Sequence, residues 1–201
     1  MDTIVNKVAQ SGLETIDLEA FYDAAPKVQL DIKDWLFMGL MLKEKEFRES
    51  LKSHAWDQYA GQHVAVFCST DAIVPTWAYM LIANKLSGIA KSVVFGSLAD
   101  LELKLFVQAI DKMDIEAFRD QRVVVKGCSK HPVPTSAYVY LTERLTPVVK
   151  SIMYGEPCST VPIYKRPWFL VGKIAGIALI GNIFAALKSD LWNYYSFLFL
   201  S

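Results

Sequence analysis

The stretch RVVVKGCSKHPVPTSAYVYLTERL, residues 122–145, joins a strand-like run to a helix-like pattern. Its first five residues are rich in β-branched side chains, which favour an extended strand. The pattern then changes at Pro134, because proline suits the first turn of a helix. Beyond it, Tyr138, Leu141 and Leu145 recur at helical spacing. The stretch therefore predicts one strand followed by one helix.

Similar runs stand on both sides of this unit, at intervals of roughly thirty residues, which is about the length of one strand-helix unit. They are HVAVF from His63, SVVF from Ser92 and SIMY from Ser151. Helical patterns with start and stop signals fill residues 75–88 and 97–110. This alternation predicts the α/β class: a mostly parallel sheet of at least four strands with helices packed on it, in a three-layer, Rossmann-like arrangement.

We divide the chain by its composition. Residues 61–166 carry the predicted α/β core, and residues 1–60 are expected to extend the same domain. In this extension, KVQLDI from Lys27 is typical of an edge strand. The stretch KEKEFRESLKSHAW from Lys43 is typical of an amphipathic helix that buries Phe47.

The end of the chain has a different composition. Residues 168–187, WFLVGKIAGIALIGNIFAAL, contain one charged side chain, Lys173, and have the length of a membrane span. The alternative is a buried C-terminal helix of the domain, followed by an aromatic tail at residues 188–201. In a span, Gly172 and Gly176 would let two helices approach closely, which makes a homodimer one candidate assembly.

Charge and cysteine content limit the classes of partner. The chain has 21 basic and 21 acidic residues and three cysteines. This balance lacks the basic surface that nucleic-acid binding requires, so we expect no nucleic-acid partner. The N-terminus has no secretory pattern, so we expect reduced thiols and a cytoplasmic domain, with residues 168–187 as a candidate anchor in the inner membrane.

All three cysteines occur in one local context: Cys68, Cys128 and Cys158 are each followed by serine and, a few residues later, by Val-Pro. If the preceding strands form one sheet, the three thiols emerge at its carboxyl edge, where open parallel sheets bind ligands. We therefore predict a three-thiol pocket that binds a soft metal, an iron–sulfur cluster or a sulfur-carrying ligand. His131 and Asp71 are candidates for a fourth ligand position, and zinc is the other candidate metal.

Two other interpretations of the same residues stay open. Cysteine is also a small buried apolar side chain, so the protein could be a non-catalytic adaptor with structural thiols. In the second interpretation, one cysteine of low pKa is a nucleophile and His131 its base. No residue is assigned as catalytic, and we favour an accessory protein over an enzyme.

Several longer runs resemble one bacterial family, that of the domain of unknown function 2480, over about residues 4–166. The runs are DIKDWLF, LKEKEFRE, DAIVPTWAYM, VVFG, KGC, PVPTSAY and VKSIMYGEPCSTVPIYKR. The resemblance implies a cytoplasmic protein and brings no activity, cofactor or catalytic residue with it. Through the gene neighbourhoods of the family, it also implies iron–sulfur assembly proteins as partners. The sequence departs from the family at Pro167–Ser201, which is an addition.

Overall fold

The structure is a computed structural model that describes residues 12–127, 130–156 and 159–167. Its helices and strands, in chain order, are β1 (Leu13–Asp17), β2 (Lys27–Asp31), α1 (Glu44–Ser53), β3 (His63–Phe67), α2 (Thr76–Leu86), β4 (Ser92–Phe95), α3 (Leu98–Asp111), β5 (Arg122–Lys126), α4 (Thr135–Leu145), β6 (Ser151–Glu156) and β7 (Ser159–Lys165). Short 3-10 helices are η1 (Leu18–Phe21), η2 (Lys33–Trp35), η3 (Trp56–Tyr59) and η4 (Ile115–Phe118).

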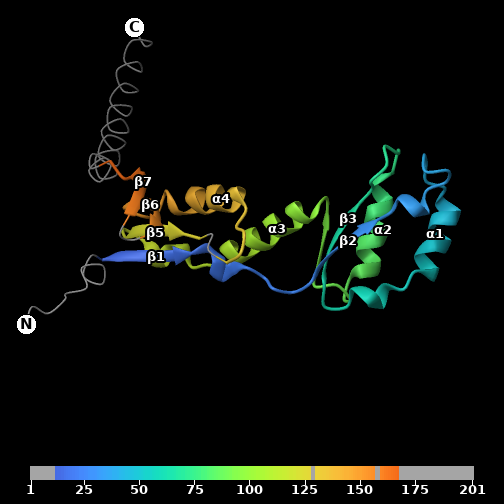
Figure 1. Cartoon of the computed structure of the whole chain (residues 1–201), viewed down its shortest axis with the longest axis horizontal. Helices are drawn as coiled ribbons and strands as arrows, with labels where there is room; N and C mark the ends of the chain where they lie inside the picture. The colour runs from blue at the N-terminus through green and yellow to red at the C-terminus, as the bar shows by residue number, and fades with distance from the viewer. Residues whose placement is uncertain (1–11, 128–129, 157–158, 168–201) are drawn as a thin grey trace, which may run out of the picture.

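The described strands form two sheets at the two ends of an elongated molecule (Figure 1). The four-stranded sheet has the order β1-β5-β6-β7, and the three-stranded sheet has the order β2-β3-β4. All pairs are parallel except β6 with β7. We call the part around the three-stranded sheet the amino half and the part around the four-stranded sheet the carboxyl half.

The predicted α/β class and the mostly parallel sheet are confirmed, but the expectation that the four predicted strands share one sheet is wrong. β3 and β4 lie in one sheet, whereas β5 and β6 lie in the other. The reason is α3, whose 14 residues extend about 21 Å and carry the chain from one sheet to the next. β1 and β2 then give each central strand, β5 and β3, its own first partner.

Helix α3 belongs to the cores of both halves. Near its start, Leu101 and Leu105 pack with Ala65 of β3. Further along, Phe106 and Ile110 join the buried cluster around β1, β5 and α4. The helix begins with a capping box between Ser97 and Asp100, so its start is stabilised locally. α3 thus connects two hydrophobic cores that each sheet would otherwise close alone.

The two sheets follow one another head to tail. β1 ends at Asp17, and the segment after it leads to the first residue of β2 (Figure 1). In that segment Asp23 hydrogen-bonds His63, the first residue of β3. The carboxyl edge of the four-stranded sheet therefore faces the amino edge of the three-stranded sheet.

The two halves repeat the same sequence of elements. β3, α2 and β4 correspond to β5, α4 and β6 at a constant distance of 59 positions. The edge strands match too, because β1 and β2 both end in an aspartate, Asp17 or Asp31, that accepts the N–H two residues later. The internal echo around the first two cysteines is therefore the visible part of a repeat in the fold.

Most predicted elements are confirmed at their expected positions, including β2 as an edge strand and α1 with Phe47 buried. Two strands, β1 and β7, lie outside the prediction. Residues 168–187 lie beyond the described chain, so the proposed span is not seen there. Among the residues that are described, no helix is long and apolar enough to cross a membrane.

Candidate functional site

The strands that precede Cys128 and Cys158 are neighbours in the four-stranded sheet. β5 and β6 run parallel, with Val125 paired to Tyr154. Cys128 comes two positions after β5 and Cys158 two positions after β6, so both follow carboxyl ends of adjacent strands. Both cysteines themselves lie outside the described residues.

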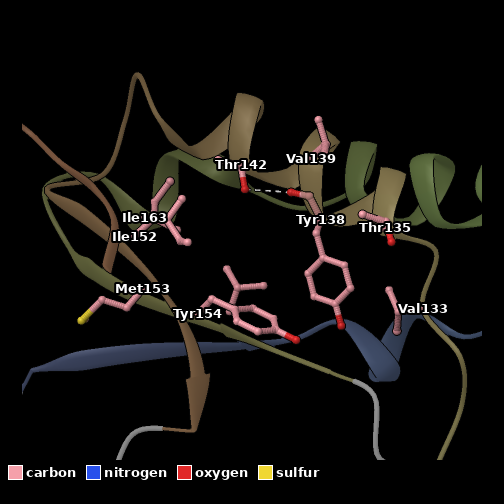
Figure 2. Close-up of a pocket in the computed structure, with 10 residues that line it drawn as sticks. Val133, Thr135, Tyr138, Val139, Thr142, Ile152, Met153, Tyr154 and Ile163 are labelled. Atoms are coloured by element: carbon pink, nitrogen blue, oxygen red, sulfur yellow. Dashed lines mark hydrogen bonds between the residues drawn. The ribbon is translucent and has the colours of Figure 1, made fainter. Parts of the chain in front are cut away.

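A cavity of about 550 Å³ lies beside these strand ends, between α4 and the strands β6 and β7 (Figure 2). Its buried wall consists of Val125, Val133 and Ile152. Exposed apolar side chains form its rim, among them Val139 of α4 and Ile163 of β7. The remaining lining residues are Thr135, Tyr138, Thr142, Met153 and Tyr154. A mostly apolar cavity of this size with a few polar groups is typical of a small-molecule site.

Two tyrosines supply most of the polar character of this cavity. The rings of Tyr138 and Tyr154 meet edge to face, with centroids 5.6 Å apart, and their hydroxyls point to the same side (Figure 2). The Thr142 hydroxyl is not available in the same way, because it donates to the carbonyl of Tyr138 at 2.8 Å. A Cβ at Gly127 would lie 2.5 Å from the Tyr138 hydroxyl oxygen. Glycine at position 127 therefore lets Tyr138 reach the end of β5.

His131 follows β5 and is held against the neighbouring segment. Its ring stacks on Tyr22, with centroids 4.1 Å apart and an interplanar angle of 4°. One residue earlier, the N–H of Lys130 donates to a carboxylate oxygen of Glu19 at 2.9 Å. These contacts fix the loop after β5 on η1, so an imidazole stands at the carboxyl edge of the four-stranded sheet.

Cys68 lies at the carboxyl end of β3, in the amino half, and packs against the core of that half. Its sulfur is 3.3 Å from the hydroxyl of Thr70, and Asp71 beside it is exposed. The N–H of Ser69 donates to Asp31 at 3.1 Å. Burial raises the pKa of Asp31, but hydrogen bonds from Ser69 and Lys33 outweigh it and hold the pKa below its usual value.

A family model described as "Protein of unknown function (DUF2480)" matches residues 2–166. The chain belongs to this family. The predicted resemblance to the domain of unknown function 2480 is thereby confirmed, and the family's match contains every described strand and helix. No curated protein and no solved structure gives a match.

In this member of the family, the strand ends that precede the three cysteines do not share one sheet edge. β3 lies in the three-stranded sheet and runs away from the four-stranded sheet, so Cys68 is separated from that sheet's carboxyl edge by the length of a five-residue strand, about 15 Å. Asp71 lies with Cys68, and His131 lies with the carboxyl half. Within the described ranges, no three His, Cys, Asp or Glu side chains are placed to hold a metal ion. The metal and cofactor ligands stay a prediction.

The sequence pattern did not reveal the cavity itself. Ile163 belongs to β7, and Tyr154 lies on the strand that β7 covers. Without β7, the exposed side of β6 has no second wall. A signal was present, because VPIY in residues 161–164 alternates apolar side chains, but Pro162 argued against a strand.

Proposed function

We propose that this protein is an accessory protein that binds a metal, an iron–sulfur cluster or a sulfur-carrying ligand through Cys128 and Cys158 in the carboxyl half. This proposal keeps two of the three predicted thiols and makes Cys68 a structural residue of the amino half. The observation that supports it is the parallel pairing of β5 with β6, because the two cysteines follow adjacent strand ends. Thiolates are the ligands that soft metals prefer.

Two neighbouring features suit such a ligand. The imidazole of His131, fixed by its stack on Tyr22, supplies a third donor of the type that zinc and iron sites use. The apolar cavity beside β6 would accommodate the carbon part of a sulfur-carrying ligand, with the hydroxyls of Tyr138 and Tyr154 available to orient it. The proposed partners are iron–sulfur assembly proteins in the cytoplasm, and fractionation of the full chain would test residues 168–187 as an anchor.

The test is metal and sulfide analysis of the full chain, reconstituted without oxygen with iron and sulfide or with zinc alone. We expect near-stoichiometric metal in the unchanged chain and its loss in Cys128→Ser and in Cys158→Ser. Cys68→Ser is the matched control, because it changes the corresponding cysteine of the other half. It should retain the metal.

Other outcomes would separate the alternatives. Loss of metal in all three variants would support the three-thiol pocket. A metal-free chain in every condition, with all three cysteines tolerating replacement, would contradict the proposal and favour an adaptor.

One surface specifically favours the adaptor as a second candidate. At the carboxyl edge of the amino half, the side chains of Met80 and Phe95 are 67% and 66% exposed, and Ile73 is 86% exposed. Exposed apolar side chains grouped in this way are typical of protein-protein contacts. Pull-down of defined iron–sulfur assembly proteins, compared between the unchanged chain and Phe95→Glu, would measure this function.

A further inference from the structure

A second cavity of about 450 Å³ lies between the two halves, at the amino edge of the three-stranded sheet. Helix α3 forms one side of it, and the segment between β1 and β2 forms another. Asp23, His63, Lys91, Ser92 and Lys112 are the polar and charged residues that the argument uses. Unlike the apolar cavity of the carboxyl half, this one is rich in groups that can exchange protons or carry charge.

Three of these side chains form one hydrogen-bonded row. His63 and Ser92 are the first residues of β3 and β4 and are paired in register. The His63 Nδ1 atom is 2.8 Å from the Ser92 Oγ, and its Nε2 atom is 3.0 Å from the Asp23 Oδ2. The His63 residue is 3% exposed, whereas the Asp23 side chain is 37% exposed. Hydroxyl, imidazole and carboxylate therefore stand in a line from three separate segments.

The chemistry of the carboxylate fixes the direction of these hydrogen bonds. The N–H of Ala25 lowers the pKa of Asp23, burial opposes it, and His63 and Lys91 lower it further, with a net pKa below the usual value. An ionised carboxylate can only accept hydrogen bonds, so the Nε2 of His63 must donate to it. In the neutral ring Nδ1 is then the acceptor, and the Ser92 hydroxyl donates to it.

We infer that Ser92, His63 and Asp23 form an acyl-transfer site that hydrolyses small anionic esters or thioesters. Ser92 is the nucleophile, His63 the general base and Asp23 the residue that positions the imidazole. The two ring nitrogens have exchanged roles relative to the Ser-His-Asp triad of serine proteases, in which Nε2 faces the serine. The inference concerns a different cavity from the proposed thiol site and does not depend on it.

The reaction balances without any redox partner. The Ser92 Oγ attacks the acyl carbon while its proton passes to His63 Nδ1, and the bond between the acyl carbon and the leaving oxygen or sulfur breaks. The leaving group takes the proton from His63 as it departs. Water then attacks the acyl-serine ester, gives a proton to His63, and releases the acid as Ser92 recovers its own proton.

The charge of the cavity indicates the substrate class. Lys91 and Lys112 line it, and Lys91 Nζ is 3.8 Å from Asp23 Oδ1. Two cations against one carboxylate leave a net positive charge, which favours an anionic substrate and stabilises negative charge on the acyl oxygen. The volume suits a small molecule rather than a polypeptide.

The internal repeat supplies a matched control. Ser151 is the first residue of β6 and corresponds to Ser92, but its register partner is Arg122 rather than a histidine. The two serines thus share a place in the fold and differ in the base beside them. If position in the fold alone determined reactivity, both serines would react.

The test uses the full chain and a fluorophosphonate probe, with the adduct located by peptide mass spectrometry. We expect a covalent adduct on Ser92, none on Ser151, and hydrolysis of p-nitrophenyl acetate that Ser92→Ala abolishes and Ser151→Ala retains. Asp23→Asn should slow adduct formation by a factor of about 100 or more. Because His63 is buried and its replacement could disturb the fold, the partly exposed Asp23 carries this part of the test.

Rescue distinguishes a positioning role from a structural one. Asp23→Glu restores a carboxylate and should recover a measurable part of the labelling rate, with circular dichroism confirming that each variant is folded. The inference is overturned if Ser92 forms no adduct while a serine hydrolase in the same tube is labelled. It is also overturned if the folded Asp23→Asn variant reacts as fast as the unchanged chain.

Discussion

The amino and carboxyl halves use the same frame but end it differently. In both, a helix that starts after Pro75 or Pro134 places an aromatic side chain against the last predicted strand. Tyr79 meets Phe95 edge to face at 4.7 Å, and Tyr138 meets Tyr154 in the same way at 5.6 Å. These pairs are related by the 59-position repeat, so the aromatic contact is a property of the frame.

The difference lies in the strand that follows. β6 has β7 as an antiparallel partner, and β7 contributes Ile163 to the cavity of the carboxyl half. β4 pairs only with β3 among the described strands, and the side chains beside it, Met80 and Phe95, are mostly exposed. The comparison teaches that the repeated frame alone does not make the cavity. One added edge strand turns an exposed apolar surface into a lined pocket.

The largest effect that would test this comparison comes from the buried centre of each half. Ile82 and Leu141 are fully buried, lie on α2 and α4, and correspond in the repeat. Replacing either by alanine should lower the free energy of unfolding by about 2–5 kcal/mol, because it removes buried methyl groups and leaves a cavity. Since α3 contributes to the cores of both halves, we expect each variant to unfold in one transition.

The measurement is urea unfolding followed by circular dichroism and by tryptophan fluorescence. Trp35, Trp56 and Trp77 all pack against the amino-half core, so fluorescence reports on that half once Trp168 and Trp192 are changed to phenylalanine. Coincident transitions in Leu141→Ala would show that the halves unfold together. A fluorescence midpoint unchanged by Leu141→Ala would contradict the shared core.

A smaller effect is expected at the end of β5, where the halves differ in one position. Gly127 abuts the Tyr138 hydroxyl, whereas the corresponding position 59 residues earlier is Cys68, which carries a side chain. Gly127→Ala should reduce the free energy of unfolding by about 1 kcal/mol, because the new Cβ displaces the end of a tyrosine ring. Chemical denaturation measures the change.

The clash has a specific remedy that serves as the control. Tyr138→Phe removes the hydroxyl that the new Cβ would meet. In a double-mutant cycle, Gly127→Ala should therefore cost less in the Tyr138→Phe background than in the unchanged chain. Equal costs in both backgrounds would mean that glycine is required at this position for another reason.

The sequence predicted the local elements well because their signals are local. Val123, Val124 and Val125 favour a strand by themselves, and Ser97 with Asp100 marks a helix start within four residues. It did not predict how the strands divide into sheets, because pairing depends on segments far apart in the chain. β1, with only Ile16 buried, has no strand-like periodicity and is specified by its pairing with β5.

The same limit applies to the sites. The cysteines attracted attention because their residue type and context are visible in the sequence. Asp23, His63 and Ser92 lie 40 and 29 positions apart and form no motif, so only the packed sheet brings them together. The error about one sheet edge came from the same source, since strand order decides which thiols share an edge.

The smallest expected effect concerns pH and the aromatic cluster of the amino half. The ring of His54 packs on Trp35 and Trp56, and its Nε2 atom is 3.1 Å from the Tyr59 hydroxyl. Burial lowers the pKa of His54 below the usual 6.5. The corresponding residue of the carboxyl half is Met113, an apolar side chain that packs in its core. His54 is therefore a titratable group where the repeat otherwise has none.

The sign of the effect follows from proton linkage. As the pH falls below 6.5, His54 takes up a proton in the unfolded chain before it does so in the folded one, so acid favours unfolding. The free energy of unfolding should decline on this account as the pH passes from about 6.5 towards 5. His54→Met should make the decline shallower. Urea midpoints at several pH values give both slopes, and His131→Gln, at the exposed histidine after β5, should leave the decline unchanged. Equal slopes in His54→Met and the unchanged chain would mean that the cluster accommodates the charged ring, and burial at this position would not distinguish the two halves.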